Sequence, residues 1–381
     1  MNAALIGYLA LAIFCGVALS LIARRTRQQP AAWWHCGGVA LLALALSVLF
    51  FAPRLWLMQS YVPGSFQWDR AHTFLQQCEQ PLRRDIEPAM LWRLLPPLVA
   101  HALHLPGKTP LTLPWLGLFA ATTYAALLLR RRLDDPRFVF GGTLLFATTS
   151  AVLVPVGWLG MNDAWVWLGL LAVAFGRAAW AAPVACLLCP WIDERFIIGF
   201  PLAWLVGRLE RGEPLLGRFL LTALWLLPYT AIRLALAQHN TAASEATQSF
   251  LHTQLTQRSQ LLPLLPLLPL GWWMGLRAAW GAVAYALWSW PRLHGGLTAG
   301  TLAVTLAISF VFASDLSRSV AIATPLVLAG CFAVARRHPE QAPRLVLALG
   351  VINLLIPAAH LTYLHIDPIN PLPIELFRLL R

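Results

Sequence analysis

Charged side chains that could support chemistry gather at four places in a strongly apolar chain. Each place contributes a carboxylate, and three of the four also carry an arginine. Arginine binds phosphate through paired hydrogen bonds, and a carboxylate can act as a general base. This mixture therefore predicts a site for a phosphorylated ligand. The residues at the four places are Asp69 and Arg70, then Asp163, then Asp193, Glu194 and Arg195, and finally Asp315 and Arg318.

The first of these places lies in a long polar interval between Gln67 and Pro97. An apolar stretch precedes the interval, and an apolar segment broken by Pro96 and Pro97 follows it. We predict that the interval forms the first large extracytoplasmic loop of a polytopic membrane protein and one wall of an active site.

The composition indicates a protein whose solvent is a lipid bilayer. Of its 381 residues, 59% are hydrophobic and 12% are charged, which is about half the charged fraction of a soluble domain. Apolar runs recur along the chain, so we expect an all-α polytopic membrane fold with about twelve transmembrane spans. The net charge of +12 predicts contact with membrane lipids and not with nucleic acid, because the arginines fall in short loops between apolar runs.

The chain is expected to form one transmembrane domain over residues 1–381. Residues 1–32 are predicted to form an N-terminal span and a cytoplasmic loop, residues 33–335 the core, and residues 336–381 a final span with a short outer tail. We interpret residues 90–105 as an interfacial helix that follows the first outer loop, because a crossing there would place Arg130, Arg131 and Arg132 outside.

Two short apolar segments, residues 181–191 and 196–207, flank the trio of charges at residues 193–195. Neither segment reaches the roughly 20 residues that a transmembrane helix needs. Broken helices of this kind persist where they pack in protein or line a watery cavity. We therefore predict a broken helix whose interruption faces the outside. A second outer loop, rich in Thr, Ser and Gln, is predicted over residues 238–260.

Other motifs give little support for a metal or cofactor site. The sequence lacks a P-loop, a dinucleotide-binding Gly-rich turn and a His-Glu-x-x-His motif. His101 and His104 have helical spacing without a third ligand, and His360, His365 and Asp367 are equally weak candidates. We expect no metal and no cofactor. No structural disulfide is expected, because Cys78 has no partner in its loop. Cys186 and Cys189 fall in an apolar segment, so we interpret them as small residues on one helix face and not as a redox motif.

Taken together, the pattern resembles the GT-C superfamily of membrane glycosyltransferases and its bacterial relatives. Asp69 corresponds to the acidic residue that this superfamily carries in its first large outer loop. The segment with the phrase WRLLPPL resembles the interfacial helix that follows. The phrases MNDAW, WIDERF and SDLSRS resemble later outer-facing polar points. The resemblance covers about residues 33–335.

The resemblance implies transfer of a sugar from a polyprenyl-phosphate donor to an envelope glycan, lipid or protein acceptor. The reaction would occur on the extracytoplasmic face of a bacterial inner membrane. Asp69 would be the catalytic carboxylate that activates the acceptor hydroxyl. The other candidates would bind substrate, either at the lipid phosphate or by holding sugar hydroxyls and the arginines. Candidates for the phosphate are Arg93, Arg195 and Arg318, and candidates for the second role are Asp163, Asp193 and Glu194.

Two alternatives remain open at this point. The same polar points could form the path of a polyprenyl-lipid flippase or transporter, or the chain could be a non-catalytic subunit of an envelope-assembly complex. A translocation path requires ionisable groups through the middle of the membrane. The sequence places only Arg233 and Arg277 there, which favours the enzyme.

Overall fold

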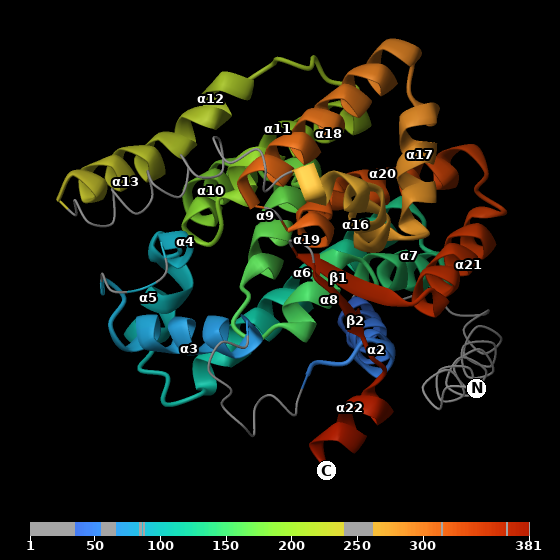
Figure 1. The fold of residues 1–381 in the computed structure, drawn as a ribbon. Coiled ribbons are helices and arrows are strands. Elements are labelled where there is room, and N and C mark those ends of the chain that lie inside the picture. The colour runs from blue at the N-terminus through green and yellow to red at the C-terminus, as the bar shows by residue number, and fades with distance from the viewer. Residues whose placement is uncertain are drawn as a thin grey trace.

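The computed structural model describes residues 35–54, 66–83, 86, 88–239, 262–313, 315–362 and 365–380. These residues are mostly helical, with one two-stranded antiparallel sheet near the C-terminus (Figure 1). The prediction of a helical fold is therefore confirmed in its main feature. The predicted N-terminal span and nearly all of the outer loop over residues 238–260 lie outside the described residues.

Three helices among the described residues are long and apolar enough to cross a membrane, namely Thr109–Arg132, Arg292–Val311 and Leu316–Arg337. A fourth is added if Pro136–Ala147 and Ser150–Gly157, which are bent by 54°, form one broken span. Shorter apolar helices of 10–17 residues accompany them. The part of the chain that the structure describes does not match the expected count of about twelve spans.

Prolines and a charged residue divide one of the apolar runs into short helices. The run that contains Pro263, Pro266 and Pro269 is split into three helices, with a break at Arg277, where φ is +51°. These helices are η6 (Leu262–Leu267), α16 (Leu268–Leu276) and α17 (Ala279–Ser289). Apolar composition alone therefore overestimates the number of full spans.

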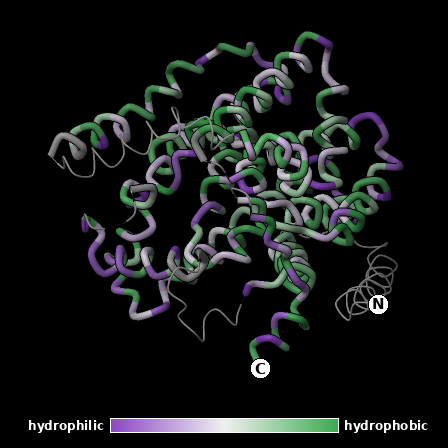
Figure 2. Tube along the Cα trace, in the orientation of Figure 1, coloured by the Kyte–Doolittle hydropathy of each residue, from purple (hydrophilic) through white to green (hydrophobic). Residues whose placement is uncertain are grey.

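The polar interval is helical and not an irregular loop. It begins with α3 (Phe66–Glu79) and continues through α4 (Pro88–Leu91), α5 (Leu95–Ala102) and η3 (Thr109–Leu111). The helix expected over residues 90–105 is thus divided into two short pieces, neither of which is long enough to cross a membrane. Figure 2 shows that hydrophilic residues gather along α3, whereas most other helices are hydrophobic.

The broken helix predicted around residues 192–195 is confirmed. An apolar segment made of α10 (Ala181–Leu188) and η4 (Cys189–Trp191) ends at the interruption, and α11 (Arg195–Arg211) begins directly after it. Both pieces pack against α9 (Asp163–Phe175), which follows α8 (Ser150–Gly157). Beyond α11, an arm of α12 (Phe219–Ala223), η5 (Leu224–Leu226) and α13 (Leu227–His239) extends from the body (Figure 1).

The main apolar core surrounds α20 (Thr324–Arg337), which is buried along nearly its whole length. Before it come α18 (Arg292–Ala313), α19 (Leu316–Ser319) and η7 (Val320–Ala323). A second layer packs α2 (His35–Phe50) and α21 (Ala342–Leu355) against α7 (Pro136–Ala147), beside α6 (Thr112–Arg132). The structure thus buries the continuous helical stretch Leu316–Arg337, which carries Arg318 near its start.

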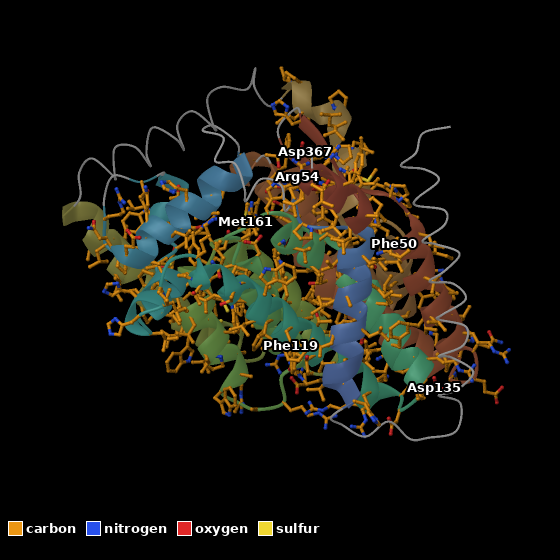
Figure 3. All side chains as sticks on the ribbon, turned by 90° about the horizontal axis from the view of Figure 1, so that it is seen from below. Phe50, Arg54, Phe119, Asp135, Met161 and Asp367 are labelled. Atoms are coloured by element: carbon orange, nitrogen blue, oxygen red, sulfur yellow. The ribbon has the colours of Figure 1, made fainter. Side chains whose placement is uncertain are left out.

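The C-terminal segment differs from the predicted final span and short tail. Helix α21 ends at Leu355, and strands β1 (Ala358–Thr362) and β2 (His365–Ile369) follow, with Ala358 opposite Ile369. The chain then forms α22 (Leu372–Leu379). Figure 3 shows Asp367 of β2 next to Arg54, beyond one end of α2, whereas Asp135 lies at the other end. The tail is therefore an ordered part of one face of the molecule.

Close packing between α17 and α20 gives a direct test of this arrangement. A Cβ added at Gly330 would collide with the carbonyl oxygen of Ala282, whereas one at Gly300 in α18 would meet open space. Overpacking typically costs about 1–3 kcal/mol, although Ala favours helix by about 1 kcal/mol relative to Gly. We expect Gly330→Ala to lower the free energy of unfolding in detergent and Gly300→Ala not to lower it. Equal effects of the two substitutions would contradict this packing.

Candidate functional site

Arg318 lies at the centre of a buried group of acidic and basic side chains. Its Nη2 donates to Asp163 Oδ1 at 2.6 Å, and its Nε donates to the other oxygen of the same carboxylate. Further contacts place Arg318 nitrogens 3.4 Å from Asp193 Oδ2 and 3.5 Å from Asp315 Oδ2. A two-pronged guanidinium–carboxylate pair of this kind is strong and fixes the geometry of both partners. One arginine therefore joins three carboxylates from distant parts of the sequence.

Asp193 is the second centre of this group. Its Oδ2 lies 2.9 Å from Arg93 Nη2 and 3.1 Å from Arg195 Nη1, and its Oδ1 accepts the backbone N–H of Arg195 at 2.9 Å. Burial alone would raise the pKa of Asp193, but Arg93, Arg195 and Arg318 together hold this pKa well below its usual range. The Asp193 side chain is therefore a stable anion over the physiological pH range.

We call these residues the ion-pair cluster and divide it into two layers by exposure. The inner layer is buried, with side chains at most 7% exposed. It consists of Asp163, Asp193, Arg195, Asp315 and Arg318. The outer layer is partly exposed, at 16% for Arg93, 29% for Glu194 and 30% for Arg233. The cluster holds four carboxylates and four guanidiniums, so it is close to electrically neutral.

The three carboxylates of the inner layer all stand at helix starts. Asp163 is the first residue of α9, Asp193 lies just before α11, and Asp315 caps α19 by accepting the N–H of Arg318. Backbone N–H groups at a helix start lack intrahelical partners, and the helix dipole is positive there. Local sequence therefore places an acid where each helix begins, and the arginines neutralise the acids that come together.

Aromatic side chains flank the outer layer. Arg233 lies 3.1 Å from Glu194 Oε1 and donates to the Tyr229 hydroxyl at 2.7 Å. Its guanidinium also sits over the ring of Trp92, 5.3 Å from the centroid. Arg93 approaches the other oxygen of Glu194 at 3.8 Å. Two partly exposed arginines therefore flank one partly exposed carboxylate.

Two hollows meet beside the cluster. A small polar cavity of about 20 Å³ is lined in part by Arg93, Asn162 and Asp163. A larger apolar groove of about 610 Å³ runs between α5, α6, α9 and α10. Pro96 and Ile192 line both hollows, so the groove ends next to the small cavity that Arg93 of the outer layer lines. The small cavity has room for about one water molecule, and the groove has the size of a ligand pocket.

The structure brings together most of the residues that the sequence singled out. The seven candidates that meet in the cluster are Arg93, Asp163, Asp193, Glu194, Arg195, Asp315 and Arg318. Five of them are buried in the inner layer, where each is paired with others of the cluster. Direct substrate contact, predicted for all seven, is therefore limited to Arg93 and Glu194 in the conformation observed.

Asp69 and Arg70 lie in the first turns of α3, and the Asp69 side chain is outside the described residues. The backbone of α3 nevertheless passes close to the turn that precedes Asp163. A Cβ added at Gly160, where φ is +80°, would lie 3.1 Å from the Cα of Ala71 and 3.4 Å from the carbonyl oxygen of Arg70. The two segments are thus neighbours, and the role of Asp69 stays a prediction.

Two residues of this region were not recognised as site residues from the sequence. Arg233 was assigned to the middle of the membrane, but it belongs to the outer layer. Its spacing of four residues from Tyr229 on one helix face was the available signal. His360 was judged a weak metal candidate, yet it lies 3.6 Å from Asp315 in a fully buried position. Its contacts with Ser317 and Asp315 could not be expected from local sequence, because Ser317 is 43 residues away.

No protein-family model, curated protein or solved structure matches the chain. The fold and the cluster define a helical protein with helices long and apolar enough to cross a membrane and with a buried ion-pair cluster. Fold alone does not determine function, so the inference that follows depends on the geometry of the cluster and the groove.

Removal of Arg318 tests the dependence of the fold on the inner layer. Arg318→Ala leaves three buried carboxylates without their common partner, and we expect it to lower the free energy of unfolding by about 3–5 kcal/mol. The control is Arg130→Ala, which breaks a partly exposed pair with Asp134 and should cost at most about 1 kcal/mol. Denaturation in detergent measures the free energy of unfolding of both variants. A decrease for Arg318→Ala no larger than that of the control would contradict the role of the inner layer.

Proposed function

We propose that this protein is a membrane glycosyltransferase that uses a polyprenyl-phosphate-linked sugar on the extracytoplasmic face of a bacterial inner membrane. The observation that carries the proposal is the position of the outer layer at the end of the apolar groove. The partly exposed guanidiniums of Arg93 and Arg233 suit a phosphate group, and the groove suits a hydrocarbon chain.

The groove has the features expected for a lipid tail. Its lining is almost entirely apolar, and four of its residues are substantially exposed on the surface of the protein. These residues are Val99, Trp180, Val184 and Leu188. A chain could therefore enter sideways from the bilayer, with its phosphate left at the outer layer. This arrangement favours a lipid-linked donor over a water-soluble one.

The distribution of charge supports the proposed orientation. The Trp165 ring N–H donates to the carbonyl oxygen of Leu113 at 3.0 Å, which ties the start of α9 to the start of α6. The cluster therefore lies near the first residues of α6, whereas Arg130 to Arg132 lie at its far end. Arg336 and Arg337 likewise end α20. Cytoplasmic loops carry an excess of arginine, so the cluster is assigned to the outer side.

In the proposed reaction, the acceptor hydroxyl oxygen attacks the anomeric carbon of the donor sugar. The bond between this carbon and the phosphate oxygen breaks, and polyprenyl phosphate leaves with the electron pair. Asp69 takes the proton from the hydroxyl, while Arg93 and Arg233 balance the charge that develops on the phosphate. A single displacement of this kind inverts the anomeric configuration. The inner layer holds Arg93 in place through Asp193.

Binding of polyprenyl phosphate by the protein in nanodiscs tests the donor site. Arg233→Ala and Arg93→Ala should each weaken binding about tenfold or more, because a hydrogen bond to a charged group contributes about 1.5–3 kcal/mol. Binding of the uncharged polyprenol should not change. Ala172→Phe, which fills the groove, should weaken binding of both lipids.

The matched control for these arginines is Arg131→Ala, an exposed arginine at the far end of α6. Equal affinities for the phosphate and the alcohol in every variant would rule out the phosphate site. Scrambling of polyprenyl phosphate across vesicles without sugar transfer would instead support the flippase alternative.

The predicted base is tested by Asp69→Asn, which keeps the shape of the side chain and removes its basicity. We expect sugar transfer to fall about 10²–10⁴-fold, with polyprenyl-phosphate binding unchanged, because the phosphate contacts lie elsewhere. Radiolabelled sugar transfer to an acceptor lipid gives the rate. Glu79→Gln, at the exposed end of the same helix, serves as the control. Transfer within a factor of a few of the wild-type rate would remove Asp69 from the mechanism.

A further inference from the structure

The C-terminal hairpin is attached at both ends to the face that carries the cluster. Arg54 Nη2 lies 3.4 Å from Asp367 Oδ1, and the Ala52 N–H donates to the Asn370 carbonyl oxygen at 2.8 Å. At the other end of the hairpin, Thr362 pairs with Asp315 in a single β-bridge. The hairpin therefore contacts the inner layer directly.

His360 of β1 adds a side chain to this contact. Its side chain is buried, and its ring packs on Trp158 with the centroids 4.4 Å apart. Nδ1 lies 2.9 Å from Ser317 Oγ, and Nε2 lies 2.5 Å from Thr362 Oγ1 and 3.6 Å from Asp315 Oδ1. Both ring nitrogens therefore have polar partners.

The hydrogen bonds around Ser317 determine how the ring is protonated. Ser317 Oγ already accepts the Leu361 N–H at 3.0 Å, so its own hydrogen is available for His360 Nδ1. Nδ1 then accepts, and the ring hydrogen is placed on Nε2, where it faces Thr362 and Asp315. The arrangement suits a neutral imidazole with a defined tautomer.

We propose that His360 is a positioning residue that joins the C-terminal hairpin to Asp315 and so fixes the carboxylate that holds Arg195 and Arg318. Asp315 Oδ2 lies 3.6 Å from Arg195 Nη2 and 3.5 Å from Arg318 Nη1, while Oδ1 faces the imidazole. His360 would hold this geometry whether the cluster binds a phosphorylated lipid or another ligand.

Protonation of His360 would disturb this geometry. A second ring hydrogen on Nδ1 would face Ser317, whose hydroxyl would have to turn away. The new cation would compete with Arg195 and Arg318 for Asp315. The charged groups that face the imidazole are Asp315, Arg318, Asp367 and Arg195. Burial, the largest influence, and the two arginines hold the pKa of His360 below its ordinary value of 6.5, against the opposing effect of the two carboxylates.

The sign of the pH dependence follows from this lowered pKa. Below pH 6.5 the unfolded chain binds a proton at His360 that the folded chain does not bind. The contribution of neutral His360 to the free energy of unfolding is therefore complete above pH 6.5, and it is lost as the pH falls towards the lowered pKa. In this window the unfolding equilibrium constant should rise by up to about tenfold for each unit that the pH falls, from this residue alone.

The test measures the unfolding equilibrium constants of His360→Gln, His360→Phe and wild type between pH 7.5 and 5. The Gln side chain cannot be protonated but retains a donor that can face Asp315. His360→Gln should therefore resemble wild type at pH 7.5 and lack the rise of the unfolding equilibrium constant in acid. The Phe side chain has a flat ring without polar atoms, so it cannot hold Asp315. His360→Phe should therefore lower hydrogen-exchange protection of the Arg318 and Ser319 amides, which donate to Asp315, at every pH. His365→Gln, on the exposed side of the same hairpin, should behave like wild type.

Two results would overturn the proposal. One is an acid response of His360→Gln equal to that of wild type, which would assign the protonation to another group. The other is unchanged protection of the Arg318 and Ser319 amides in His360→Phe, which would show that the imidazole does not hold Asp315. If His360→Phe does not fold, the acid response of His360→Gln alone decides.

Discussion

The buried guanidinium of Arg318 imposes the constraint on which the rest of the structure depends. Transfer of a charge from water into a protein interior is costly unless hydrogen-bonded countercharges surround it. Asp163, Asp193 and Asp315 provide those countercharges. Each belongs to the start of a different helix, so neutralisation of one arginine requires three helices to begin at the same place. The packing of α9, α11 and α19 around one point follows from this requirement.

The two layers of the cluster differ in exposure, and the proposed function gives them different roles. The inner charges are saturated, and a ligand that broke them apart would lose their mutual stabilisation. The outer layer is half-buried, flanked by Trp92 and Tyr229, and adjacent to the apolar groove. A phosphate could replace Glu194 beside Arg93 and Arg233 without disturbing Arg318. On the proposed function, this division would allow a rigid electrostatic scaffold and an exchangeable binding site to lie side by side.

The C-terminal hairpin adds a second set of constraints from outside the helices. His360 lies beside one oxygen of Asp315, and its ring nitrogens contact the hydroxyls of Ser317 and Thr362. Arg54 contacts Asp367 on the far side of the hairpin. Elsewhere, close helix contacts at small residues such as Gly330 bring backbones together. Van der Waals packing thus sets the distance between helices in the apolar interior, and charge pairing sets the register at the cluster.

The sequence by itself determined the helical, membrane-type character of the chain, the charged residues of the site and the helix break before Arg195. These features depend on local composition and on the minimum length of a spanning helix. Only the tertiary structure decided which charges pair, because Arg318 and Asp163 are 155 positions apart and several arginines were equally available to each acid. It also decided the number of long helices, the helical state of α3, the β-hairpin, and the places of Arg233 and His360. Each of these results from non-local packing, which the order of residues along the chain does not specify locally.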